Sequence, residues 1–339
     1  MAGVTASVAS LGLFGSAKAA PASTSHPILF TNVRLFDGTS SSLRDGLYVL
    51  VEGTRIKAVG SGTPGTPEGA RVISCGGRVI MPGLIDSHWH ALFAGVPLPV
   101  MMQGDAVFIS LAAAAEAERT LMRGFTTIRD CGGPTFALKQ AIDQGLAIGP
   151  RIYPCGAMIT SSGGHGDLRP IYEITAPGGP FGSLRAAEGA MIADGTDLVM
   201  LRVREQLLQG ASHIKVVGSG GVSSPRSPLD AMTYTEPEIR AAVDVCRDWN
   251  TSVTVHAYMP QAVQRAMAAG AQCIEHAHLM DDATAALMAE KGVWLSTQPF
   301  LSAEDQLPQT GDAIEKLEAV FSGTRNMYRL AVKHGVKTA

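Results

Sequence analysis

Short apolar runs recur along the chain from residue 84 onward, and most are separated from the next by a segment of helical periodicity. Several helical segments have clear ends: Thr235-Glu236-Pro237-Glu238 is typical of an N-terminal capping box, and Gly210, Gly270 and Gly292 follow the expected helices. A regular alternation of strand and helix predicts a (β/α)8 barrel, whose chemistry occurs at the carboxyl ends of the strands. The seven expected strands are residues 84–90, 125–130, 151–156, 213–219, 252–257, 272–276 and 293–298.

The two ends of the chain have different patterns. Residues 26–80 alternate apolar and polar side chains between turn residues, which predicts a small antiparallel, sandwich-like β domain before a barrel of residues 81–339. The last residues, 336–339, resemble the first half of an eighth strand. We therefore expect a barrel that is incomplete at its C-terminus.

Residues 1–25 resemble a leader segment. Val8 to Gly15 is apolar but too short to span a bilayer, and Ala17-Lys18-Ala19 resembles a signal-peptidase site. No basic residue precedes Lys18, unlike the start of an ordinary signal peptide. We expect export to the periplasm or the medium, and the alternative is a cytoplasmic protein with an unstructured leader.

Composition limits the partners. The net charge is −3 and lysine and arginine form no block, so nothing favours binding to nucleic acid or to a membrane surface. The five cysteines lack any C-x-x-C pair, which favours buried thiols over a disulfide framework. A small-molecule or dipeptide-like substrate is the expected partner.

Five residues near strand ends are candidate metal ligands. His88 and His90 lie two apart on one strand, so their imidazoles point the same way, although buried histidines also occur without metal. Lys215 falls at an inward position among apolar residues, where a cation is costly. Carboxylation by CO2 would explain it, and an ion-paired lysine or a catalytic base is the alternative. His256 and His276 each end an apolar strand and suit Zn²⁺ or a similar ion.

The chain at this point resembles the metal-dependent amidohydrolase superfamily, in the branch of imidazolonepropionase-like enzymes, Xaa-Pro and Xaa-Arg dipeptidases and carboxypeptidases, and ochratoxin hydrolases. The matching motifs are Met81–His90, Ser162–Gly166, Ile214–Val216 and Ile274–Ala277. The resemblance implies two divalent ions, with Zn²⁺ the first expectation. It implies His88 and His90 on one ion, carboxylated Lys215 as a bridge, and His256 with His276 on the other.

The resemblance also implies a reaction. A metal-bridging hydroxide would hydrolyse the C–N amide bond of a peptide-like or N-acyl amino-acid substrate. His165 would contact the substrate, with an ordinary turn histidine as the alternative. The Tyr234 hydroxyl would face a carbonyl oxygen, with a packed aromatic at the helix start as the alternative. A homo-oligomer is compatible with the resemblance.

Two other functions remain open. One is a mononuclear cyclic amidase of the imidazolonepropionase type, in which Lys215 does not bridge two ions. The other is a truncated, catalytically impaired relative that binds a ligand, because the family's strand-eight aspartate has no counterpart before Ala339.

Four neighbouring residues have lesser expected roles. Asp86 would hydrogen-bond an imidazole from the layer beneath the ligands, and Trp89 would point into the helix layer. His213 would fill the core, and His278 would lie at the rim. Tyr258 stands where relatives often have another histidine.

Overall fold

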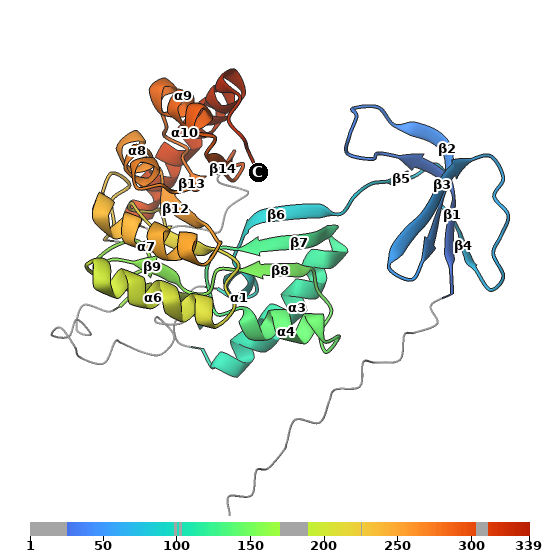
Figure 1. Cartoon of the computed structure of the whole chain (residues 1–339), viewed down its shortest axis with the longest axis horizontal. Coiled ribbons are helices and arrows are strands. Elements are labelled where there is room, and N and C mark those ends of the chain that lie inside the picture. Colours follow the sequence, from blue (N-terminus) through green and yellow to red (C-terminus); the bar gives the residue numbers. More distant parts are fainter. Residues whose placement is uncertain (1–25, 98–99, 102–103, 170–188, 225, 303–310) are drawn as a thin grey trace, which may run out of the picture. The chain divides into compact units, whose positions relative to one another are not determined.

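The computed structural model describes residues 26–97, 100–101, 104–169, 189–224, 226–302 and 311–339. The predicted leader, residues 1–25, lies outside them. The chain divides between Pro82 and Gly83 into two compact units (Figure 1). Among the described helices, none combines the length and the apolar character needed to cross a membrane.

The first unit is a five-stranded sheet. Its strands are β1 (Ile28–Leu35), β2 (Arg44–Glu52), β3 (Arg55–Ser61), β4 (Arg71–Ser74) and β5 (Val79–Ile80). β1 pairs antiparallel with β2, and β2 with β3, but β4 and β5 run parallel to β1. The expectation of a purely antiparallel unit is therefore wrong. Val33, Val49 and Cys75 form its buried core.

The second unit is an α/β structure whose strand pairs are all parallel among its named strands (Figure 1). One sheet has the order β6-β7-β8, and the other has the order β10-β9-β11-β12-β13-β14. Their bounds are β6 (Leu84–Trp89), β7 (Phe125–Asp130), β8 (Arg151–Pro154), β9 (Met158–Thr160), β10 (Ala190–Ile192), β11 (Ile214–Val217), β12 (Val253–Ala257), β13 (Cys273–His276) and β14 (Trp294–Ser296).

All seven predicted strands are present, and β9 and β10 are additional ones. The two sheets are linked where Ser212 donates from its N–H and its hydroxyl to the carbonyl oxygen of Pro154 at the end of β8. The stretch 336–339 lies parallel to β14, because Leu295 N–H donates to Lys337 O and Ala339 N–H donates to Leu295 O. The predicted strand pattern is thus confirmed, while the described strands form two sheets and not one continuous ring.

Helices alternate with these strands. They are α1 (Ala91–Ala94), α3 (Ala106–Met122), α4 (Phe136–Asp143), α6 (Thr196–Leu208), α7 (Glu236–Asp248), α8 (Pro260–Ala268), α9 (Asp282–Lys291) and α10 (Asp312–His334). The capping box at the start of α7 is confirmed, with Thr235 N–H and hydroxyl both on the Glu238 carboxylate. Gly292 ends α9 in the left-handed conformation, which glycine adopts without a Cβ penalty.

The burial of the strand residues shows which way the functional side chains point. Trp89 packs with Ala113 and Ala117 of α3 and Leu138 of α4, so its predicted place in the helix layer is confirmed. Its neighbours on β6 therefore face the opposite side, toward the interior enclosed by the strands. β11 and β12 are buried at every position. Polar side chains on their inner side are consequently removed from water.

Candidate active site

Five histidine rings form a continuous row at the strand ends. Their order is His90, His88, His276, His256 and His165, and successive ring centroids lie 5.2, 4.7, 4.4 and 4.5 Å apart. β6 and the start of α1 supply the first two rings, β13 and β12 the next two, and the turn after β9 the last. The structure thus gathers the four histidines predicted as ligands, together with His165.

Each of these rings is held through one nitrogen. The pairs are His90 Nδ1 with Gly132 O at 3.3 Å, His88 Nδ1 with Glu275 Oε2 at 2.6 Å, His276 Nδ1 with Gln298 Oε1 at 2.8 Å, His256 Nε2 with Gly220 O at 3.0 Å, and His165 Nδ1 with Ser224 Oγ at 2.8 Å. Within the described residues the second nitrogen of each ring has no hydrogen-bond partner. An imidazole oriented through one nitrogen and open at the other is arranged as a metal ligand.

Burial keeps these rings uncharged. It lowers the pKa of His88 and of His165 to about 4, with the charge of Lys215 as the next cause. It also lowers the pKa of His90, His256 and His276 well below the usual range. Neutral imidazoles carry the lone pair that a metal ion needs, so the cluster is ready to coordinate at neutral pH.

Lys215 lies in the same interior, on β11. Its side chain is 1% exposed, and in the described part of the chain its ammonium has no hydrogen-bond or ion-pair partner. Its charge acts on all five imidazoles of the row and on Glu275. The Glu275 carboxylate is the counter-charge in this interior, but its direct contacts are with His88 and Arg129. A buried cation without a direct ion pair is costly, which favours a modified or metal-associated form of this amine.

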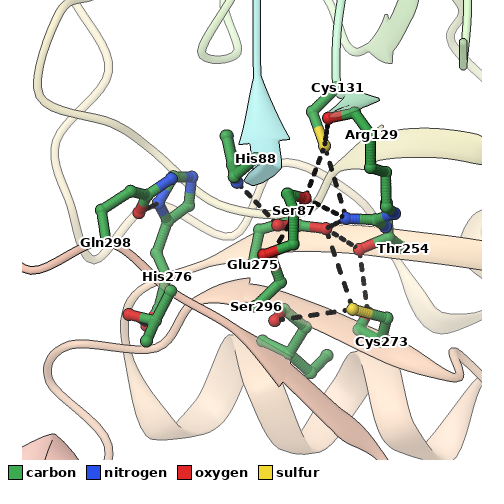
Figure 2. Close-up of polar contacts among 12 residues, drawn as sticks. Ser87, His88, Arg129, Cys131, Thr254, Cys273, Glu275, His276, Ser296 and Gln298 are labelled. Carbon is green, nitrogen blue, oxygen red and sulfur yellow. Dashed lines mark hydrogen bonds and ion pairs between the residues drawn. The ribbon is translucent and has the colours of Figure 1, made fainter. Parts of the chain in front are cut away.

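Glu275 is the site residue that the sequence analysis missed. Its carboxylate is fully buried between His88 Nδ1, Arg129 Nη1 at 2.7 Å from Oε1, and the Thr254 hydroxyl, as Figure 2 shows. Burial opposes its ionisation, but the charges of Lys215 and Arg129 outweigh burial and hold the pKa of Glu275 well below its usual range. Glu275 is therefore an anion beneath the histidine row.

An unusual backbone brings Glu275 and His276 to the same interior. Consecutive strand residues point to opposite faces, so alternation would send one of this pair into the helix layer. His276 instead has φ 76° and Ala277 has φ 48°, both in the left-handed region that favours glycine. The chain turns at His276, and its ring stacks on Tyr258 with centroids 4.8 Å apart. Backbone strain of this kind is concentrated at functional sites.

Two expectations need correction. The Tyr234 hydroxyl donates to Ala193 O at 2.7 Å within the hydrophobic core, so it is not available to a substrate carbonyl in this conformation. Asp86 accepts from the backbone N–H of His88 at 3.0 Å and not from an imidazole. The packed-aromatic alternative describes Tyr234, and Glu275 holds the imidazole bond expected of Asp86.

Three further buried side chains belong to this part of the protein: Tyr258, His213 and His278. Tyr258 is 3% exposed, and its hydroxyl has no hydrogen-bond partner among the described residues. His213 and His278 are buried, and each has one ring nitrogen without a partner in the described structure. His278 Nε2 lies 2.9 Å from Gln298 O. The burial of His213 agrees with core filling, and His278 adjoins the last strand's loop.

The donor set fits divalent metal ions. His88, Cys131 and Glu275 bring one possible ligand atom each to within 4.8 Å of one another. Arg129 already neutralises that carboxylate, and burial raises the pKa of the Cys131 thiol in the metal-free protein. The open nitrogens of the histidine row are the better donors, and Glu275 supports them from below.

Comparison with known proteins agrees with this geometry. A model of the amidohydrolase family matches residues 79–339. The chain belongs to the amidohydrolase family. Ochratoxinase from Aspergillus niger is 30% identical in an alignment of 277 positions that covers 77% of this chain and 57% of that protein. This member therefore spans little more than half the length of that relative.

Solved structures extend the similarity. A prolidase complexed with N-methylphosphonate-L-proline is 33% identical, with a TM-score of 0.83 over 92% of this amidohydrolase and 77% of that chain. A Xaa-Pro dipeptidase with methionine bound in its active site is 26% identical, with a TM-score of 0.78 over 92% and 78% of the two chains. The predicted membership of this superfamily is confirmed, and its members are generally metal-dependent.

Proposed function

We propose that this protein is a metal-dependent amidohydrolase that cleaves the C–N bond of a dipeptide-like or N-acyl amino-acid substrate, with its strands arranged as a (β/α)8-type barrel. The histidine row carries the proposal, because each of its five neutral rings is fixed at one nitrogen and open at the other. The prolidase and Xaa-Pro dipeptidase among its structural neighbours favour the peptide-like substrate class.

The metal ligands in this proposal are His88, His90, His256, His276 and Lys215. The Lys215 ammonium would first lose one proton to solvent. Its Nζ lone pair would then form an N–C bond with CO2 as one C–O π bond opens onto oxygen, and a second proton would leave the nitrogen, which replaces a buried cation by an anionic carbamate. Its burial without a direct ion-pair partner among the described residues supports this modification. Divalent ions held there supply an activated water and a polarised carbonyl.

Two further side chains would bind the substrate. Ser224 Oγ accepts from Gly166 N–H at 3.1 Å and can donate to His165 Nδ1, which leaves a hydrogen on His165 Nε2 for a substrate oxygen. Burial raises the pKa of Tyr258, so its hydroxyl stays protonated and remains a donor. We assign to Tyr258 the carbonyl contact first expected of Tyr234.

Metal content and turnover test the proposal together. We expect wild-type protein to contain two divalent ions per chain by elemental mass spectrometry, and to release free amino acid from a panel of Xaa-Pro dipeptides and N-acyl amino acids. In Lys215→Met, metal affinity and activity should each fall by more than about 100-fold, which is the largest loss typical when a metal ligand loses its hydrogen-bond partner. Lys139→Met removes an exposed lysine and should behave as wild type.

The outcomes separate the alternatives. One ion per chain with hydrolysis of a cyclic amide favours the mononuclear cyclic amidase. Two ions without turnover of any panel member favour a ligand-binding relative. Wild-type protein that contains no metal and still hydrolyses the panel contradicts the mechanism, and full activity in Lys215→Met contradicts the carbamate.

A further inference from the structure

Glu275 holds His88 in a way that differs from the other four rings of the row. His90 and His256 contact backbone carbonyl oxygens, and His276 and His165 contact a neutral amide and a hydroxyl. Of the five, only His88 is held by a side chain of full charge, at 2.6 Å. The nature of this partner determines what the His88 ring can do.

An ionised carboxylate accepts hydrogen bonds and cannot donate them. The hydrogen between Glu275 Oε2 and His88 must therefore belong to Nδ1 of the imidazole. In a neutral ring this leaves the lone pair on Nε2, the nitrogen without a partner. A carbonyl oxygen would impose the same tautomer, but without the negative charge that makes Nε2 a stronger electron donor.

The carboxylate is itself fixed on its other oxygen. Arg129 Nη1 lies 2.7 Å from Oε1, and the Thr254 hydroxyl donates to the same oxygen (Figure 2). Arg129 Nη1 also donates to Ser87 O at 3.0 Å, on the residue before His88. The contacts of Glu275 and Arg129 therefore connect β6, β7, β12 and β13 beneath the row. Three strands are needed to place one carboxylate against the ring on the fourth.

We propose that Glu275 is a positioning residue that orients His88, fixes its Nδ1–H tautomer and strengthens Nε2 as a metal ligand. Arg129 has a separate task, which is to keep the buried carboxylate compensated. This inference rests on the proposed metal-dependent function for its consequence, but the tautomer itself is a property of the metal-free protein.

The first experiment measures metal affinity. Metal-free protein is titrated with Zn²⁺ against a competing chelator, in wild type and in Glu275→Gln, which keeps the size of the side chain and removes its charge. We expect affinity to fall about 10- to 100-fold. Thr254→Val removes the hydroxyl that donates to Glu275 Oε1 and lies 3.3 Å from Cys273 O, keeps the charge of Glu275, and should change affinity much less. Glu116→Gln alters a carboxylate of α3 that pairs with Arg119 and Arg123, and it should leave the Zn²⁺ affinity unchanged.

The second experiment needs no variant at the site. ¹⁵N NMR of the metal-free wild-type protein, assigned with a His88→Gln sample, reports which nitrogen of His88 carries the hydrogen. We expect Nδ1–H in wild type. An Nε2–H ring, or equal Zn²⁺ affinity in Glu275→Gln and wild type, overturns the proposal. Wild-type protein that binds no divalent ion defeats the proposed function instead, and the NMR result still decides the orientation of His88.

The role of Arg129 is tested by pairing substitutions. Arg129→Met alone removes the direct ion pair of a buried carboxylate, so the unfolding midpoint should fall sharply. In Arg129→Met/Glu275→Gln the midpoint should recover while Zn²⁺ affinity stays as weak as in Glu275→Gln. Recovery of affinity along with stability would assign Glu275 a structural role only and overturn the proposal.

Discussion

Asp130, at the end of β7, is a buried carboxyl group beside the row. It accepts from Ala91 N–H at 3.1 Å and from the Thr135 hydroxyl at 2.7 Å. Burial outweighs these hydrogen bonds and raises its pKa to about 7. The unfolded chain holds the same proton with a pKa of about 3.9. The folded protein thus binds more protons between these values, and stability contributed by Asp130 falls as pH rises from about 4 to 7.

Asp130→Asn removes this titration and keeps an oxygen that can accept from Ala91. Relative to wild type, the free energy of unfolding of the variant should improve as pH rises from about 4.5 to 7. Urea unfolding of metal-free protein at both pH values measures the change. Asp197→Asn, an exposed substitution at the start of α6, serves as control. A difference between Asp130→Asn and wild type that is constant with pH would contradict the assignment.

At the level of single residues, the sequence predicted the side chains and missed some partners. Lys215, His256 and His276 stand in apolar runs, where a polar residue is conspicuous. Glu275 stands in such a run too, and burying its carboxylate is as costly as burying the Lys215 amine. Its partners His88 and Arg129 lie 187 and 146 residues away along the chain. No local pattern encodes contacts across the interior.

At the level of elements, strand and helix periodicity predicted most of the second unit but could not place side chains where a strand ends irregularly. Alternation assigns Glu275 and His276 to opposite faces. The left-handed turn at His276 and Ala277 instead brings both side chains to the same interior. The short strands β9 and β10, with three residues each, offer too few positions for a period to be read. For Tyr234 the sequence left a substrate contact and a packed aromatic both open, because its place depends on the packing of α7 against neighbouring elements.

The turn after β13 can be tested with two matched alanines. Ala277 and Ala257 are both fully buried and each follows a histidine of the row, but only Ala277 has a positive φ. A glycine at either site loses a buried methyl group, worth about 0.8 kcal/mol. At Ala277 it also relieves left-handed strain of about 1 kcal/mol.

Ala277→Gly should therefore reduce the free energy of unfolding by about 1 kcal/mol less than Ala257→Gly. Chemical denaturation of the two metal-free variants beside wild type measures the difference. Equal losses at the two positions would mean that the backbone at Ala277 is not strained.

At the level of the whole molecule, the site couples folding, protons and metal. Burial lowers the pKa of all five histidines of the row, and of His88 and His165 to about 4. An unfolded histidine has a pKa of about 6.5. The unfolded chain therefore binds more protons between these values, and stability is lost as pH falls below about 6.5. This loss of stability as pH falls opposes the loss that Asp130 causes as pH rises, and it involves five histidines against one aspartate.

The same protons compete with metal for the ring nitrogens. A divalent ion that binds only the folded protein raises the unfolding midpoint. We expect Zn²⁺ or Mn²⁺ to raise the midpoint clearly at about pH 7.5 and much less at about pH 4, because the His88 ring, whose pKa in the folded protein is about 4, is then partly protonated. Thermal unfolding with and without metal at both pH values measures this. His256→Gln should weaken the metal effect at pH 7.5, whereas His334→Gln, at the Asp282 ion pair between α9 and α10, should keep it. A metal effect equal at both pH values would place the binding site away from the histidine row.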